Sequence, residues 1–124
     1  EKLGYQPYAA WIAGADYGVD PKYMGIGPAY SNMKLLQKQG MKLSDISVYE
    51  CNEAFAAQNL GVIREMENLS GEKIDQAKAN AYCKSLSAKA EKAIDRLREI
   101  GGKYALVTMC IGGGMGTAVI LKNL

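Results

Sequence analysis

The C-terminal end of the chain constrains the fold more than any other stretch, because two strand-like segments flank a glycine-rich turn. Residues 104–110 and 117–121 are apolar runs that include Val, Leu, Ile and Thr, and residues 112–116 are four glycines and one methionine. Apolar runs of this length, bounded by turn residues, are typical of strands. Two such strands joined by a short turn pair antiparallel. The sequence therefore predicts a sheet that contains an antiparallel hairpin.

Upstream of this hairpin, strand-like and helix-like segments alternate. Residues 8–14 and 46–49 are short apolar runs that predict buried strands, and residues 15–27 have the composition of a turn-rich loop. Residues 28–39 and 53–68 carry apolar side chains at helical spacing. The predicted buried faces of these two helices are Ala29, Met33 and Leu36 in the first, and Ala56, Leu60, Ile63 and Met66 in the second.

A third helical region covers residues 72–100, where Ala, Lys and Glu dominate. One long helix and two shorter ones fit this region equally well. Its apolar stripe consists of Tyr82, Leu86, Ala90, Ala93, Ile94 and Leu97. The resulting order, β-α-β-α-α-β-β, predicts an α/β fold in which one domain over residues 1–124 has a mixed sheet with helices on both faces.

Composition and charge exclude several functional classes. The chain has 15 Lys and Arg against 13 Asp and Glu, and its net charge of +2 gives no electrostatic basis for nucleic acid or membrane as a partner. No apolar run approaches the ~20 residues that span a bilayer. The absence of histidine excludes His-based acid–base catalysis, His-containing triads and His-ligated metal sites.

The three cysteines, Cys51, Cys83 and Cys110, are odd in number and show no CxxC spacing, which disfavours a disulfide framework or a Cys-rich zinc site. Burial as small hydrophobic residues is the ordinary interpretation of Cys51 and Cys83. Free thiols favour a reducing compartment, and the first residues lack both an apolar signal core and an initiator Met. We therefore expect a cytoplasmic chain that is an excised or processed piece of a longer protein.

The glycine run can carry chemistry in more than one way. A dinucleotide-binding pattern would need glycine where Thr117 stands and a helix after the loop, but strand-like residues follow. Glycines beside Cys110 can instead let the backbone approach a ligand and direct N–H groups at a developing oxyanion, while the thiol exchanges a proton. The plainer alternative is a tight hairpin with a buried cysteine.

The second segment with chemical potential covers residues 50–58, at a strand-to-helix junction. Asn52 is a predicted N-cap, and Glu53 is a favourable charge in the first turn of a helix. In the alternative interpretation, Asn52 faces a site and orients a water molecule or a carbonyl group.

Three motifs taken together resemble one family. Asn-Glu-Ala-Phe-Ala-Ala-Gln at 52–58, Cys-Ile-Gly-Gly-Gly-Met-Gly-Thr-Ala at 110–118 and Met-Gly-Ile-Gly-Pro at 24–28 resemble the C-terminal half of thiolases, the acetyl-CoA acetyltransferase family. The resemblance runs over about residues 5–75 and 94–124. It implies a βαβαβαββ half with a mixed five-stranded sheet, which packs against a similar half. It also implies an enzyme that condenses two acyl-CoA molecules or cleaves a 3-ketoacyl-CoA.

Roles for individual residues follow from the same resemblance. Cys110 would be the acid–base thiol that handles the proton on the second substrate. Asn52 would hold the water of one oxyanion hole, and the Gly112 N–H would contribute to the other. Met24 would line the channel for the pantetheine arm. Coenzyme A or acyl-CoA would be the substrate, with no covalently bound cofactor.

The sequence departs from the family in two places. The nucleophilic cysteine of the family belongs to its N-terminal half, and the family's Gly-His-Pro segment is missing or replaced here by the Ala- and Lys-rich residues 76–92. The family histidine orients the nucleophile and stabilises the thioester oxygen. We therefore expect an acyltransferase domain that is inactive alone, with a thiolase N-terminal half or a second copy as its partner.

A non-catalytic alternative stays open. In this interpretation the chain is a stand-alone or engineered domain that acts as a scaffold, a CoA binder or an assembly partner. Lys34, Lys38 and Lys42 could attract the phosphates of CoA, but they fit a solvated helix face equally well.

Overall fold

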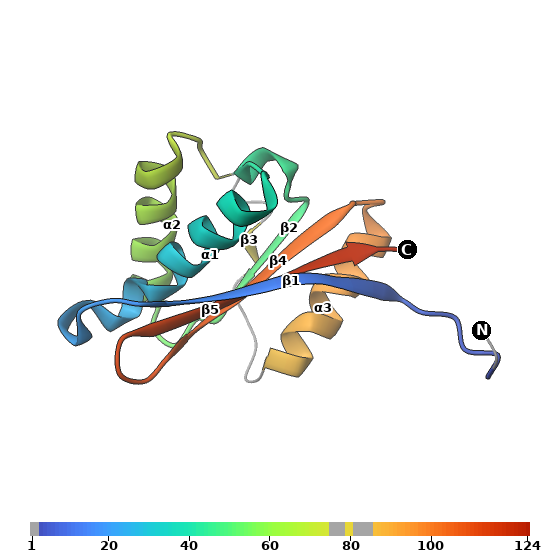
Figure 1. Cartoon of the computed structure of the whole chain (residues 1–124), viewed down its shortest axis with the longest axis horizontal. Helices are drawn as coiled ribbons and strands as arrows, with labels where there is room; N and C mark the ends of the chain where they lie inside the picture. Colours follow the sequence, from blue (N-terminus) through green and yellow to red (C-terminus); the bar gives the residue numbers. More distant parts are fainter. Residues whose placement is uncertain (1–2, 75–78, 81–85) are drawn as a thin grey trace.

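The computed structural model describes residues 3–74, 79–80 and 86–124. Within these residues, one mixed sheet has the strand order β1-β5-β4-β2-β3 (Figure 1). The strands are β1 (Ala9–Gly18), β2 (Val48–Cys51), β3 (Ala79–Asn80), β4 (Tyr104–Ile111) and β5 (Met115–Asn123). The α-helices are α1 (Gly27–Gln39), α2 (Ala56–Ser70) and α3 (Leu86–Glu99), and two short 3-10 helices are η1 (Pro21–Ile26) and η2 (Leu43–Asp45).

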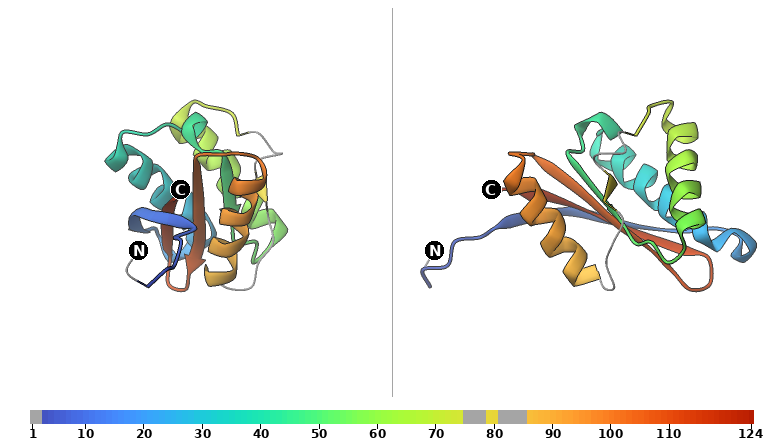
Figure 2. Two further views of the ribbon diagram at one scale, coloured as in Figure 1. Left: turned by 90° about the vertical axis from the view of Figure 1, so that its right-hand side faces the viewer. Right: turned by 180° about the vertical axis from the view of Figure 1, so that it is seen from behind.

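Helices cover both faces of the sheet, as Figures 1 and 2 show: α1 and α2 lie on one face and α3 lies on the other. Alternation along β4 divides the core accordingly, because successive side chains of a strand point to opposite faces. Leu106 packs in the cluster with α1 and α2, whereas Ala105 and Val107 pack with Ala93 and Leu97 of α3. The predicted fold class, with a mixed sheet and helices on both faces, is confirmed.

The order of elements contains one strand more than the residue pattern predicted. Ala79 and Asn80 form β3, which pairs parallel with Tyr49 and Glu50 of β2. The prediction of helix throughout residues 72–100 is therefore wrong at this point, because the open edge of a parallel strand outweighs local helix propensity. The observed order matches the βαβαβαββ pattern that the family resemblance implied. Within the proposed replacement segment, residues 76–78 and 81–85, Tyr82 among them, lie outside the described residues, and residues 86–92 belong to α3.

The start of α2 differs from the prediction. Phe55, not Asn52, occupies the N-cap position, and the helix begins at Ala56. The backbone N–H of Asn52 donates to the carbonyl of Thr108 at 3.0 Å, so pairing with β4 holds Asn52 in an extended segment. The buried face is also rotated from the predicted one. Ile63 and Met66 are buried as expected, whereas Ala56 and Leu60 are exposed and Asn59 and Val62 take their place.

The first strand extends further than its apolar run, into the predicted loop. β1 pairs with β5 as far as Gly18, opposite Met115, and a bulge at Ile12 shifts the register. The polar residue Asp16 is included because β5 offers backbone partners along the whole length, and backbone pairing does not require an apolar side chain. Most of the remaining predicted loop forms η1. Asp20 is the N-cap of this helix, and its side chain accepts a hydrogen bond from the Lys22 N–H.

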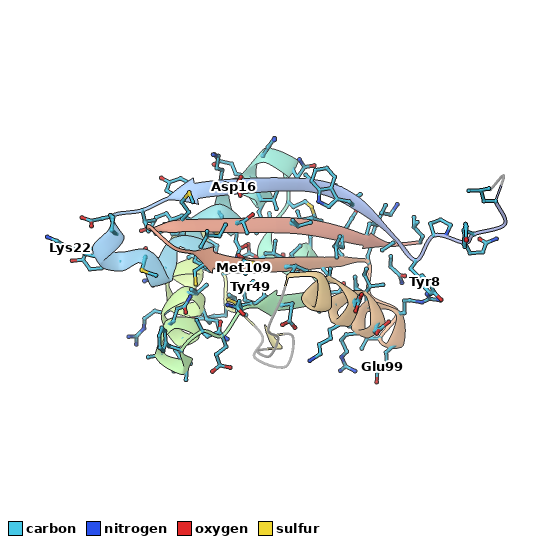
Figure 3. The ribbon with its side chains drawn as sticks, turned by 90° about the horizontal axis from the view of Figure 1, so that it is seen from below. Tyr8, Asp16, Lys22, Tyr49, Glu99 and Met109 are labelled. Atoms are coloured by element: carbon cyan, nitrogen blue, oxygen red, sulfur yellow. The ribbon has the colours of Figure 1, made fainter. Side chains whose placement is uncertain are left out.

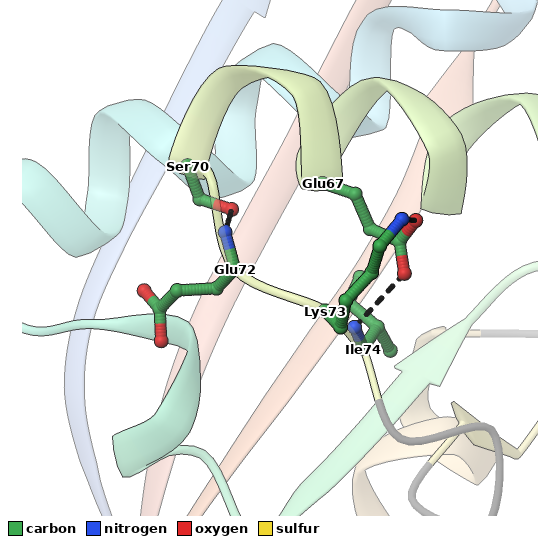
Figure 4. Close-up of polar contacts among 5 residues, drawn as sticks. All are labelled: Glu67, Ser70, Glu72, Lys73 and Ile74. Atoms are coloured by element: carbon green, nitrogen blue, oxygen red, sulfur yellow. Dashed lines mark hydrogen bonds and ion pairs between the residues drawn. The ribbon is translucent and has the colours of Figure 1, made fainter.

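Carboxylates fix the chain after α2. Glu67 accepts hydrogen bonds from Lys73 Nζ at 2.8 Å and from the Ile74 N–H at 3.0 Å (Figure 4). The hydrogen bond from Lys73 is the main cause of the lowered pKa of the Glu67 carboxyl group. The Glu72 carboxylate accepts from the backbone N–H groups of Leu43 and Ser44. These contacts tie the end of α2 to the segment that leads into β2.

Candidate active site

The carboxyl ends of β2 and β4 bring two of the candidate residues to one end of the sheet. These strands are parallel, and Cys51 is the register partner of Thr108. Asn52 follows β2, and Cys110 lies two residues beyond Thr108 on β4. In open α/β sheets, ligands bind beyond the carboxyl ends of such strands. Asn52 and Cys110 therefore lie on neighbouring strands at the end where a ligand site is expected.

Cys110 faces the layer of α1 and α2. It lies on the same side of β4 as Leu106, because the pairing of β4 with β5 has no shift between these residues. The thiol is free and half-buried. Its pairing partner on β5 is Gly116, so no side chain of β5 lies directly opposite the thiol.

Two glycines bring the start of α1 into backbone contact with the hairpin. A Cβ atom on Gly27 would lie 2.9 Å from the Gly116 nitrogen, and a Cβ atom on Gly116 would overlap the Gly27 carbonyl and the Pro28 nitrogen. Both positions are buried. Only glycine lets two backbones approach this closely. The contact joins the Met-Gly-Ile-Gly-Pro motif to the end of the Cys-Ile-Gly-Gly-Gly-Met-Gly motif.

The hairpin glycines differ in what surrounds them. Gly114 has φ +87°, its carbonyl accepts a hydrogen bond from the Val19 N–H at 2.6 Å, and a Cβ atom there would overlap the Val19 carbonyl. Gly112 is exposed, and a Cβ atom there would meet nothing within 4 Å. The idea that the glycines make room for a ligand is therefore wrong for Gly114 and Gly116, which make room for this chain's own backbone. Gly112 has open space around it.

The helix η1 carries Met24, whose side chain is 42% exposed. The first turns of α2 pack against η1: Gln58 Nε2 donates to the Gly25 carbonyl at 3.1 Å, and Gly61 lies against Ile26. Since η1 also contacts β4 and β5, all four predicted site residues belong to segments that meet at this end of the sheet. The N-termini of α1 and α2 both lie here, where their backbone N–H groups favour negative charge.

Behind this end of the sheet lies a buried polar cluster. Asn32 of α1 donates to the Tyr49 hydroxyl at 3.1 Å and to the Met66 sulfur at 3.3 Å. The pKa of the Tyr49 hydroxyl is raised well above its usual value. Burial is the largest cause, and the neighbouring Cys51 is the next largest. Cys51 is buried as predicted, and its thiol donates to the Asn52 carbonyl at 3.9 Å. The cluster connects the core of the α1–α2 layer to the residue that precedes Asn52.

Sequence reasoning did not assign roles to Gly27, Gly116 and Gln58. All three are part of the quoted motifs, but their partners are distant in sequence, and only the fold brings them together. Cys83 lies outside the described residues. Of the candidate lysines, Lys34 donates to the Asp16 carbonyl at 3.0 Å and lies over the ring of Tyr17, which gives it a structural contact.

Among the described residues, no acidic, cysteine or histidine side chains cluster in a way that could hold a metal ion. The same residues include no helix that is long and apolar enough to cross a bilayer.

A family model described as "Thiolase, C-terminal domain" matches residues 5–123. The chain belongs to the thiolase family. The resemblance seen in the three motifs is thereby confirmed, and the thiolase domain occupies almost the whole chain.

Individual relatives show the same relationship. The thiolase domain is 38% identical to β-ketothiolase BktB of Cupriavidus necator, over 100% of this chain and 32% of the relative. It is also 38% identical to an acetyl-CoA acetyltransferase of Syntrophomonas wolfei, over 100% of this chain and 33% of the relative. The domain thus spans about a third of the length of these enzymes. The alignment with BktB has 134 positions for 124 residues, so ten positions of the relative have no counterpart here.

Solved structures agree with the sequence matches. Human mitochondrial 3-ketoacyl-CoA thiolase, solved in complex with CoA, superposes with a TM-score of 0.86 at 34% identity, over 99% of this chain and 32% of that one. The Syntrophomonas wolfei acetyl-CoA acetyltransferase gives a TM-score of 0.88 at 31% identity, over 99% and 33%.

We predict that Gly27→Ala and Gly116→Ala each lower the free energy of unfolding by about 1–3 kcal/mol, because the added methyl group overlaps backbone that cannot move independently. Gly112→Ala is the matched control, since open space surrounds Gly112, and should stay within about 0.5 kcal/mol of the parent. Urea unfolding followed by circular dichroism measures all three. Equal midpoints for the three variants would contradict the proposed backbone contact.

Proposed function

We propose that this domain provides the acid–base residues of a thiolase-type acyl-CoA C-acyltransferase, of the acetyl-CoA acetyltransferase type, and cannot complete acyl transfer alone. The strongest support is the meeting of three motifs at η1, where Cys110, Asn52, Gly112 and Met24 belong to segments in mutual contact. Sequence similarity to acetyl-CoA acetyltransferases and β-ketothiolases supports the choice of reaction.

In the proposed chemistry, the Cys110 sulfur in its thiolate form takes a proton from the carbon next to the thioester carbonyl. The electron pair of the broken C–H bond moves into the carbonyl group and gives an enolate. A water molecule held by Asn52 stabilises the oxygen of that enolate, and the Gly112 N–H serves the second oxyanion. The exposed Gly112, two residues beyond Cys110, supports this role, because open space surrounds it and no side chain blocks the approach of a substrate there.

Met24 is proposed to line the path of the pantetheine arm. Its side chain is partly exposed at the same end of the sheet as Cys110, on a segment held by α2 and by the hairpin. A thioether on an unbranched chain adapts to irregular apolar surfaces, which suits a flexible ligand arm. Coenzyme A or an acyl-CoA is accordingly the proposed ligand, and the CoA complex of the human relative supports this choice.

Two groups needed for acyl transfer are expected from elsewhere. The resemblance places the nucleophilic cysteine in the N-terminal half of thiolases, and this chain spans about a third of its relatives' length. The chain also has no histidine, whereas the family motif contains one. Loss of a positioned base or of an oxyanion donor typically costs ~10²–10⁴ in rate.

A non-catalytic role is the second candidate, in which the domain is a scaffold, a CoA binder or an assembly partner. The missing histidine favours it. A cytoplasmic location suits either candidate, since Cys51 and Cys110 form no disulfide among the described residues.

We predict that the purified chain does not cleave acetoacetyl-CoA with CoA above the uncatalysed rate, because acyl transfer needs a nucleophile that these residues do not supply. Loss of the enolate absorbance at alkaline pH measures the reaction, and Cys110→Ala is the control for background. Turnover by the parent chain that Cys110→Ala abolishes would overturn the proposed incompleteness and indicate a complete site.

We propose that a partner covers the exposed part of the sheet face on which α3 lies. Helix α3 packs on β2, β4 and β5, and leaves the region around β1 and the hairpin end uncovered, as the view in Figure 3 shows. Trp11 of β1 is 67% exposed there, with its ring over Gly14, and Ile111 and Met115 of the hairpin are also exposed. A thiolase N-terminal half is the proposed natural cover, and a second copy of this chain would replace it when that half is absent.

We therefore predict that the chain alone self-associates, with a weight-average sedimentation coefficient that rises with concentration. Trp11→Lys should reduce this rise, because it places a charge on the exposed sheet face. Leu60→Lys is the matched control, since Leu60 is equally exposed but lies on α2, in the opposite layer. A monomer at every concentration, or equal effects of the two variants, would count against this face as the interface.

A further inference from the structure

Gln58 bridges two of the motifs that build the site. Its backbone N–H donates to the Phe55 carbonyl at 3.0 Å, which fixes it to the loop that follows Asn52. Its side-chain Nε2 donates to the Gly25 carbonyl at 3.1 Å, next to Met24. One residue therefore connects the segment that carries Asn52 to the segment that carries Met24.

The Gly25 carbonyl has a specific need for this donor. In η1 the bonds run between residues three apart, as in the bond from the Gly27 N–H to the Met24 carbonyl. The next bond of this kind would join the Gly25 carbonyl to the N–H of residue 28, but Pro28 has no N–H. The amide of Gln58 donates to the Gly25 carbonyl instead.

The aliphatic part of Gln58 also determines how closely α2 approaches η1. A Cβ atom on Gly25 would lie 3.2 Å from Gln58 Cγ, so the side chain packs directly on the Gly25 backbone. One turn further along α2, Gly61 lies against Ile26. The half-buried Gln58 side chain is thus both a spacer and a hydrogen-bond donor between the two segments.

We propose that Gln58 is a positioning residue that sets the separation between the Met24 segment and the Asn52 loop, and so the width of the channel for the pantetheine arm of CoA. This inference rests on the proposed function for its ligand, but its mechanical part concerns this chain alone. The amide acts through Gly25 and touches no reacting atom.

Gln58→Glu is the sharpest test, because the two side chains have nearly the same shape but a carboxylate cannot donate a hydrogen bond. At pH 7.5 the charged variant should bind CoA about tenfold more weakly by calorimetry, since about 1.4 kcal/mol is tenfold in affinity. Amide protection factors over residues 21–27 should also fall by about tenfold. Below the carboxyl pKa, about 4.3 in model peptides, the protonated group can donate again, and protection should recover. A merely structural loss of packing would not recover with pH.

Two further variants complete the experiment. Gln58→Met has a similar length and no charge, so it should lose protection at every pH and should not recover; it also serves if the charged variant does not fold. Gln37→Glu introduces the same charge at an exposed position of α1 and should match the parent throughout.

The outcomes separate this inference from the proposed function. Loss and recovery of protection in Gln58→Glu, in a chain that binds no CoA, would retain the positioning role and overturn the proposed ligand. Unchanged protection in both Gln58 variants, with CoA bound as tightly as by the parent, would overturn the positioning role and leave the proposed function standing.

Discussion

The backbones of Gly27 and Gly116 touch without any side chain between them, and the rest of the site depends on this contact. It places the first residue of α1 against the start of β5, and therefore η1 against the hairpin that follows Cys110. A methyl group at either position would push these segments apart. The second glycine contact, in which Gly114 accommodates the Val19 backbone, fixes the other side of the same hairpin. Packing between backbones thus explains Gly114 and Gly116, whereas Gly112 and Gly113 have open space around them.

This packing has chemical consequences for Cys110. The thiol lies at the carboxyl end of β4, beside Gly116 and next to the strand that leads to Asn52. The N-termini of α1 and α2 lie beside η1 at the same end of the sheet, where their backbone N–H groups favour negative charge. Gln58 holds α2 and η1 together by a hydrogen bond across 33 residues of sequence. The arrangement supports the proposed acid–base role for Cys110, and we propose that the nucleophile of acyl transfer comes from other residues.

The sequence predicted the parts of this structure that depend on local signals. The hairpin from Tyr104 to Asn123 follows from two apolar runs and the glycines between them, and α1 ends at Gln39, as the pattern over residues 28–39 predicted. Prediction failed where distant pairing decided the outcome. Asn52 has the chemistry of a helix cap, but its backbone N–H pairs with the Thr108 carbonyl of β4, and α2 begins only at Ala56. Ala79 and Asn80 lie in a stretch whose Ala- and Lys-rich composition favours helix, but the edge of β2 pairs with them.

The candidate site shows the same division. Cys110, Asn52, Gly112 and Met24 were identified from motifs, because each motif is a continuous stretch of sequence. The contacts between motifs were not predicted, since Gly27 with Gly116 and Gln58 with Gly25 are pairs that only the fold brings together. A sequence motif therefore indicated which residues matter, and the structure indicated how they are held.

We propose that Cys110 acts as an acid–base group in this domain even without the nucleophile. Exchange of the methyl protons of acetyl-CoA with deuterium from solvent, followed by proton NMR, tests this half-reaction directly. We expect the parent chain to speed the exchange above the rate in buffer and Cys110→Ala to return it to that rate. Equal rates with the parent chain, with Cys110→Ala and in buffer alone would contradict this role for Cys110.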